Sequence, residues 1–112
     1  MFMAAPEPNP QVRALYEHCA RRPRAVRSRR WGETVFKVDH RAFAFLGRLE
    51  EPSVTVKLPR RERRPLLRSG EVVRDRFVGF LGWVTVHVVD QRTMDLACEL
   101  VDRSYERAAR PG

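Results

Sequence analysis

GWVTVHVVDQRTMDLACELVDRSYERAA, residues 82–109, is the one stretch of this sequence in which residue pattern, length and turn residues agree. Val84, Val86 and Val88 recur at every second position, which predicts a strand with one buried face. The polar residues 90–92 predict a turn, and Thr93 is expected to cap the helix that follows. The stretch therefore predicts a strand, a tight turn and a long helix.

The predicted helix is amphipathic. Apolar side chains recur on one side at helical spacing, with Leu100 on the flank: Met94, Ala97, Cys98, Val101, Tyr105 and Ala108. Charged residues occupy the opposite side, where Glu99–Arg103 and Glu106–Arg110 are favourable pairs four residues apart. We expect the apolar stripe to pack against a sheet.

The preceding residues predict that sheet. Four further strands alternate with turn residues: 34–38, 42–49, 53–58 and 72–77. Phe43 and Phe45 are expected on one face of their strand, because they are two residues apart. Residues 24–30 are interpreted either as a short edge strand or as an extended connection.

Two shorter helices complete the prediction. Residues 11–21 predict a helix with Asn9 as its cap, and residues 60–68 predict one that begins or is kinked near Pro65. The order is then α-β-β-β-α-β-β-α. It predicts an α+β two-layer sandwich, with an antiparallel sheet of about five strands and helices on one face.

Composition bounds the domain organisation and the compartment. We expect a disordered, Pro-rich tail over residues 1–9 and a single domain over 10–112. No apolar run reaches the roughly 20 residues of a membrane span, and residues 1–10 lack the features of a signal peptide, so a cytoplasmic location is expected. Cys19 and Cys98 are interpreted as small buried hydrophobes, without a disulfide or a metal.

The net charge of +8 favours anionic partners, nucleic acid first. Two clusters carry much of it: Arg21, Arg22, Arg24, Arg27, Arg29 and Arg30, and then Arg60, Arg61, Arg63, Arg64 and Arg68. Guanidinium groups suit phosphate oxygens, so binding would be backbone-directed and salt-sensitive. The chain has twenty arginines and two lysines, which equally indicates a coding bias towards arginine. Both interpretations stay open.

Aromatic and lysine residues refine this hypothesis. An exposed Trp31 or Trp83 would add stacking on a base. Lys37 and Lys57 both lie in predicted strands and would project from one face if these strands share a sheet. They are either a site that needs a compact ammonium group or two ordinary exposed lysines.

Several short sequences follow one another along the chain in a characteristic order. They are Trp31-Gly32 followed by residues 35–38 and 43–44, residues 54–57 followed by Leu66-Leu67, residues 82–86, and residues 102–105. In this ordered set the chain resembles the MmcQ/YjbR family of small bacterial proteins over nearly the whole domain. The resemblance implies an α/β sandwich similar to secretion chaperones and DNA binding through a double-wing arrangement, and it supplies no established catalytic residues to carry over. Phe80-Leu81 departs from the basic residues that commonly precede the Gly-Trp pair.

No residue pattern predicts an enzyme. His18, His40 and His87 lack metal-ligand spacing, and the chain has neither a nucleophile elbow nor a glycine-rich phosphate loop. We therefore expect no catalytic residue, no cofactor and no metal. The alternative to DNA binding is a protein-interaction or small-ligand module that uses the exposed sheet face, with Phe80, Leu81 and Trp83 as the interface of a homodimer or another complex.

Overall fold

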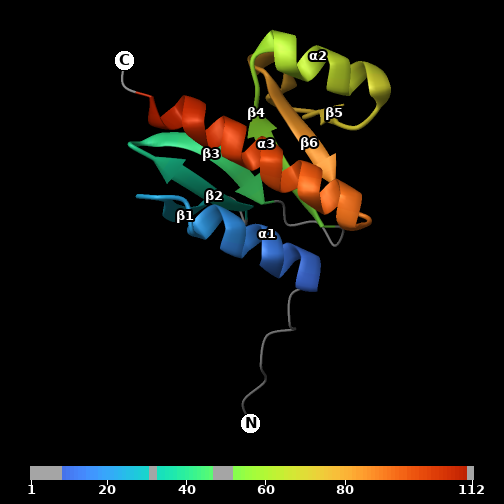
Figure 1. Cartoon of the computed structure of the whole chain (residues 1–112). Coiled ribbons are helices and arrows are strands. Elements are labelled where there is room, and N and C mark those ends of the chain that lie inside the picture. The colour runs from blue at the N-terminus through green and yellow to red at the C-terminus, as the bar shows by residue number, and fades with distance from the viewer. Residues whose placement is uncertain (1–8, 31–32, 47–51, 111–112) are drawn as a thin grey trace.

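The computed structural model describes residues 9–30, 33–46 and 52–110 (Figure 1). The elements are, in order, α1 (Pro10–Ala20), β1 (Val26–Arg30), β2 (Glu33–Val38), β3 (Arg41–Leu46), β4 (Ser53–Lys57), α2 (Arg60–Ser69), β5 (Val73–Arg74), the 3₁₀ helix η1 (Gly79–Leu81), β6 (Trp83–His87) and α3 (Gln91–Ala109). Apart from Asn9, the predicted tail lies outside the described residues.

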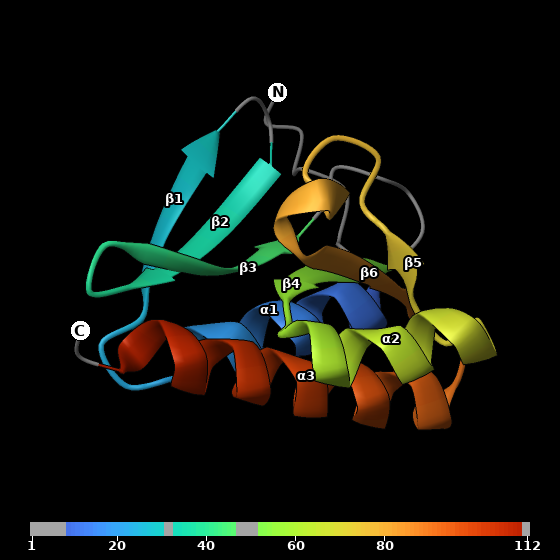
Figure 2. The same cartoon turned by 90° about the horizontal axis from the view of Figure 1, so that it is seen from above.

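The strands form one antiparallel sheet in the order β1-β2-β3-β4-β6-β5. In Figure 2, α1, α2 and α3 lie on the same side of this sheet. The predicted α+β architecture is therefore confirmed, with one more strand than expected. The additional strand is β1, because residues 26–30 pair along their whole length with β2 and form an edge of the sheet.

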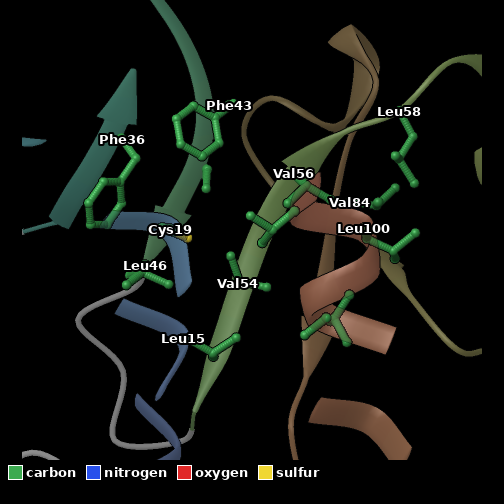
Figure 3. Close-up of a cluster of buried hydrophobic side chains, with 14 of the residues drawn as sticks. Leu15, Cys19, Phe36, Phe43, Leu46, Val54, Val56, Leu58, Val84 and Leu100 are labelled. Carbon is green, nitrogen blue, oxygen red and sulfur yellow. The ribbon is translucent and has the colours of Figure 1, made fainter. Parts of the chain in front are cut away.

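The hydrophobic core lies between the sheet and helices α1 and α3 (Figure 3). Val84, Val86 and Val88 are almost fully buried there, which confirms the predicted period of two. Leu100 is only 3 % exposed and belongs to this core, although we expected it on the flank of the stripe. The α1 side of the core comes mainly from Leu15 and Cys19.

The helix starts are set by side-chain caps. In α1, the side chain of Asn9 accepts a hydrogen bond from the Gln11 backbone N–H, as predicted. In α3 the cap is Asp90, and Thr93 is the third helical residue, so the prediction of Thr93 as the cap is wrong. Asp90 Oδ1 accepts from the Thr93 N–H at 2.8 Å and Thr93 Oγ1 accepts from the Asp90 N–H at 3.0 Å, which makes a reciprocal capping box.

A β-bulge in β3 corrects the prediction for its two phenylalanines. Phe36 pairs with Ala44 and Lys37 pairs with Ala42, so Phe43 is an extra residue in the ladder. The bulge turns Phe43 into the core, where its ring meets Tyr105 edge-on. Phe45 lies on the opposite face, against Trp83. The two rings therefore do not share a face.

The region after α2 also differs from expectation. Helix α2 is continuous through Pro65 and ends at Ser69. It is capped by Gly70, whose φ of +81° is a left-handed conformation that glycine adopts without strain. The strand predicted over 72–77 is only two residues long. It ends early because the Asp75 carboxylate accepts hydrogen bonds from the backbone N–H groups of Phe77 and Val78, which folds the chain into a turn.

Candidate functional site

The sheet opens between β3 and β4. Their ladder ends at the pair Ala44 and Val56, and beyond it the first residues of β3 and the last residue of β4 are not paired with each other. Ser104 of α3 bridges this opening, because its Oγ donates to the Phe43 carbonyl at 2.7 Å and accepts from the Lys57 N–H at 3.2 Å. Ser104 is 2 % exposed, so this hydroxyl is inside the protein. It takes the place of the direct backbone hydrogen bond that β3 and β4 do not make at this point.

A pocket of about 300 Å³ lies beside this bridge. It is lined by Arg41, Ala42, Lys57, Trp83, Ser104, Arg107 and Ala108. We call it the β3–β4 pocket. Three of its lining residues are cationic and none is acidic, so the arrangement suits an anion.

The three cations differ in how far the protein neutralises them. Arg41 Nη1 donates to the backbone carbonyls of Ala108 and Arg110, at the negative end of the α3 dipole. Lys57 and Arg107 are exposed, and among the described residues no carboxylate lies within ion-pair distance of either. The pocket therefore keeps a positive charge after Arg41 has offset the helix end.

Trp83 forms a wall of the pocket and is not an exposed surface. It is 8 % exposed, and its ring meets Phe45 edge-on with 4.8 Å between centroids. This corrects the expectation of Trp83 as an open stacking platform or interface residue, because the ring folds back over β4 towards β3. Trp31, the other candidate for stacking, lies outside the described residues.

Lys37 and Lys57 project from the same face of the sheet. Lys37 lies between the buried residues Phe36 and Val38, and Lys57 follows the buried Val56, so both point away from the helix-covered face. Strand β3 separates them. Lys57 lines the β3–β4 pocket and Lys37 does not.

The arginines of residues 21–30, which we call the N-terminal arginine segment, mostly contact other parts of the protein. Arg22 pairs with Asp102 at 3.0 Å, Arg24 pairs with Asp39 at 3.0 Å, and Arg21 lies 3.8 Å from Glu17. The Arg27 guanidinium donates to the Tyr16 hydroxyl and lies over its ring. Arg29 is exposed, and the side chain of Arg30 lies outside the description.

The arginines of α2 have fewer contacts. Arg63 donates to the Leu58 carbonyl at 2.9 Å and helps attach the helix. The other four are exposed, and in the part of the chain that the structure describes none has a carboxylate within ion-pair distance: Arg60, Arg61, Arg64 and Arg68. We call these four the α2 arginine face. The acid of this helix, Glu62, pairs with Arg103 of α3 at 2.9 Å.

The two arginine-rich regions do not form one surface. Strand β1 is one edge of the sheet, whereas α2 follows β4 and lies near the β5–β6 edge. Both views show α2 at the end of the molecule away from β1 (Figures 1 and 2). The β3–β4 pocket is closer in sequence to α2, since Lys57 lies three residues before Arg60.

An apolar loop precedes β6. Phe77, Phe80 and Leu81 are 77 %, 81 % and 52 % exposed, so two of the three predicted interface residues do lie on the surface. Gly82, with a φ of +96°, ends the loop, and a Cβ there would lie 3.3 Å from Arg63 Nη1. The loop therefore lies close to the start of α2.

A polar cluster joins α1 to α3. Asp102 Oδ1 lies 2.8 Å from His18 Nε2 and 3.0 Å from Arg22 Nη1. Beside it, burial raises the pKa of the Cys19 thiol to about 12. Such a thiol is neutral and a poor nucleophile at physiological pH, so the arrangement suits structural support. Among the described residues, no three metal-ligating side chains come together.

Three polar residues of the pocket were not predicted from the sequence: Arg41, Ser104 and Arg107. One signal was available for Ser104, because it follows Ala97 and Val101 along the buried side of α3. A hydroxyl at such a position requires a hydrogen-bond partner. Arg41 and Arg107 gave no comparable signal, since the chain holds arginines throughout.

The fold and the pocket define a small α+β protein with three helices on one face of an antiparallel sheet and a cationic pocket where the sheet opens. A comparison with models of protein families matched residues 20–107 to the family described as YjbR. The chain belongs to this family, which confirms the resemblance drawn from its local sequences. A search of curated proteins found no match. No helix in the described ranges has the length and apolar character needed to cross a membrane.

Proposed function

We propose that this protein binds the phosphate backbone of nucleic acid through the α2 arginine face. The observation that supports the proposal is that these four guanidinium groups are exposed and have no carboxylate partner in the described chain. Unpaired guanidinium groups release counterions from a phosphate backbone without first breaking an internal ion pair. The N-terminal arginine segment is less suited, because Arg21, Arg22 and Arg24 already have carboxylate partners and Arg27 contacts Tyr16.

The spacing of the α2 arginine face fits a nucleic-acid strand. Residues 60, 64 and 68 are four apart and therefore follow one side of the helix. At about 1.5 Å per residue they span roughly 12 Å. Along a duplex axis this length carries roughly three to four phosphates of one strand. No hydrogen bond to a base is part of the proposal, so low sequence specificity is expected.

Fluorescence anisotropy with a labelled duplex, measured from low to high salt, tests the proposal. A triple variant, Arg60→Gln, Arg64→Gln and Arg68→Gln, is compared with a matched control, Arg21→Gln, Arg24→Gln and Arg29→Gln. Both lose the same net charge. The measured quantity is the slope of the logarithm of the binding constant against the logarithm of the salt concentration. We expect its magnitude to fall by about 3 in the α2 variant and by no more than about 1 in the control. Equal losses in both variants, or no binding by the wild type at low salt, would refute the proposal.

A second candidate is a protein interface at the apolar loop, favoured by the exposure of Phe77, Phe80 and Leu81. Light scattering of the wild type and of Phe80→Asp tests it. A dimer that the substitution dissociates supports this function. A wild type that remains monomeric, with Phe80→Asp behaving identically in pull-downs, argues against it. Either candidate is a binding function that requires no catalytic residue, cofactor or metal, and either fits a cytoplasmic protein.

A further inference from the structure

We infer that the β3–β4 pocket binds the terminal phosphate of a phosphate monoester. This ligand chemistry has two sources: the phosphorylated end of a nucleic-acid strand, or a free small molecule such as a mononucleotide. The first source rests on the proposed function, and the second is independent of it. The inference goes beyond backbone binding by α2, because it assigns a separate site with its own charge and shape.

The charge of the pocket favours a dianion. Arg41, Lys57 and Arg107 line it together with no carboxylate. Arg41 is partly offset by the carbonyls at the end of α3, whereas no carboxylate of the described residues lies within ion-pair distance of Lys57 or Arg107. A phosphate monoester carries a charge of about −1.5 to −2 at pH 7, which matches the two cations Lys57 and Arg107. A carboxylate or an internal phosphodiester carries one charge and would leave a cation unmatched.

The shape of the pocket favours an organic group attached to that phosphate. Its volume of about 300 Å³ exceeds what an inorganic ion fills and lies at the lower end of small-molecule sites. Ala42, Ala108 and the ring of Trp83 supply apolar wall. The two alanines leave space that any longer side chain would occupy, so the pocket has room for a ring or a short chain.

Ser104 shapes the pocket without being free to donate to a ligand. Its one proton goes to the Phe43 carbonyl, and its oxygen accepts from the Lys57 N–H. It is therefore a positioning residue that holds β3 and the end of β4 apart at a defined distance. Direct contact with the phosphate then falls to the three cations.

The choice of lysine at position 57 agrees with this geometry. The chain uses arginine twenty times and lysine twice, and one of the two lysines lines the pocket. An ammonium group is compact and donates in three directions, whereas a guanidinium group is wider and planar. Lys57→Arg is therefore expected to keep the charge but to reduce the space and weaken binding several-fold.

NMR titration of the ¹⁵N-labelled protein in phosphate-free buffer tests the inference, with the Trp83 indole N–H as the reporter. The probes are adenosine monophosphate, inorganic phosphate and adenosine. We expect saturable shifts around the pocket with the monophosphate at concentrations up to about 10 mM, weaker shifts with phosphate, and none with adenosine. Arg107→Met and Lys57→Met should each weaken binding at least tenfold, whereas the control Arg29→Met, at an exposed arginine outside both the pocket and the α2 arginine face, should not. Unperturbed spectra of the unliganded variants show that each has folded.

Two oligonucleotides distinguish the sources of the phosphate. A single strand with a 5′-phosphate is compared with the same strand bearing a 5′-hydroxyl. Tenfold tighter binding of the phosphorylated strand, lost in Arg107→Met, supports the strand end. Equal binding of both strands, alongside saturable binding of the monophosphate, supports a free small molecule.

The absence of saturable shifts with both monophosphate and phosphate would overturn the inference, and so would shifts that Arg107→Met leaves unchanged. The NMR shifts with monophosphate and phosphate do not depend on whether the α2 variant binds a duplex. Failure of the proposed function and failure of this inference are therefore distinguishable.

Discussion

The two ends of the sheet hold similar numbers of arginines and use them in opposite ways. At the β1 end, formed by α1 and the N-terminal arginine segment, Arg22, Arg24 and Arg27 contact an acid or a tyrosine elsewhere in the fold. At the α2 end, formed by the last residue of β4, α2 and the apolar loop, the α2 arginine face and Lys57 have no carboxylate partner among the described residues.

A count of arginines therefore does not identify a binding surface. What decides is whether an acid lies opposite each guanidinium group, and that depends on residues far apart in the sequence. Arg22 and Asp102 are 80 residues apart, yet they lie 3.0 Å from each other. An arginine paired in this way is part of the scaffold, whereas an unpaired one remains available to an anion.

The largest expected effect concerns the bridge at the α2 end. Ser104→Ala leaves the Phe43 carbonyl and the Lys57 N–H without their shared partner, and we expect a loss of about 2 kcal/mol in the free energy of unfolding. Urea denaturation measures it. A loss below about 0.5 kcal/mol would show that the two strands do not depend on this hydroxyl, because a typical surface substitution costs that much.

A smaller effect is expected at the β1 end. Arg22→Met keeps the apolar stem but removes the ion pair with Asp102 and the hydrogen bond to the His18 carbonyl. Because Arg22 and Asp102 are partly exposed, solvent screening limits the loss to about 1 kcal/mol. The control is Arg21→Met, whose exposed pair with Glu17 is longer. Urea denaturation measures both variants. An equal shift of the urea midpoint in both would contradict a larger contribution of Arg22 to stability.

The β1 end is also expected to weaken at alkaline pH. Burial raises the pKa of Cys19 from 9.0 to about 12, so the folded protein keeps the thiol protonated while the unfolded chain ionises above pH 9. Stability therefore falls as the pH rises from about 9, by roughly 1 kcal/mol at pH 10. Urea denaturation at pH 8 and at pH 10 measures this fall. A Cys19→Ala variant should lose less stability over the interval, and parallel losses would refute the mechanism.

The smallest effect is expected on the α2 arginine face. Arg64→Met removes a guanidinium group that has no carboxylate partner in the described chain, so we expect a change in stability within about 0.5 kcal/mol. Denaturation of Arg64→Met beside Arg22→Met compares the two ends directly. A loss at Arg64 as large as that at Arg22 would show that the α2 end also depends on its arginines and would remove the contrast.

Much of the fold was predictable because local patterns decide it. The period of two at Val84, Val86 and Val88 and the cap at Asn9 follow from neighbouring residues alone. The bulge at Phe43 was not predictable, since it depends on how β2 and β3 align. The cap of α3 was misplaced because Asp90 and Thr93 are both good caps, and only the backbone geometry distinguishes them.

The candidate site was less predictable than the fold. Lys57 was identified because lysine is rare in this chain, but its neighbours in the pocket come from β3, β6 and α3. Arg41 and Arg107 are 66 positions apart in the sequence and resemble every other arginine there. Only tertiary packing brings them together, and no spacing rule of a single helix or strand encodes it.

The attachment of α2 has a consequence for amide hydrogen exchange. The helix has no fully buried residue, and Pro65 gives no N–H to the Arg61 carbonyl. Its anchors are Leu66 and Leu67 against the core, the Glu62–Arg103 pair and the Arg63 contact with Leu58. Helices held this lightly open without global unfolding, so α2 amides should exchange well before those of α3. A polyanion bound across the α2 arginine face would slow that exchange. The exchange rate of the α2 amides would then show whether the polyanion is bound.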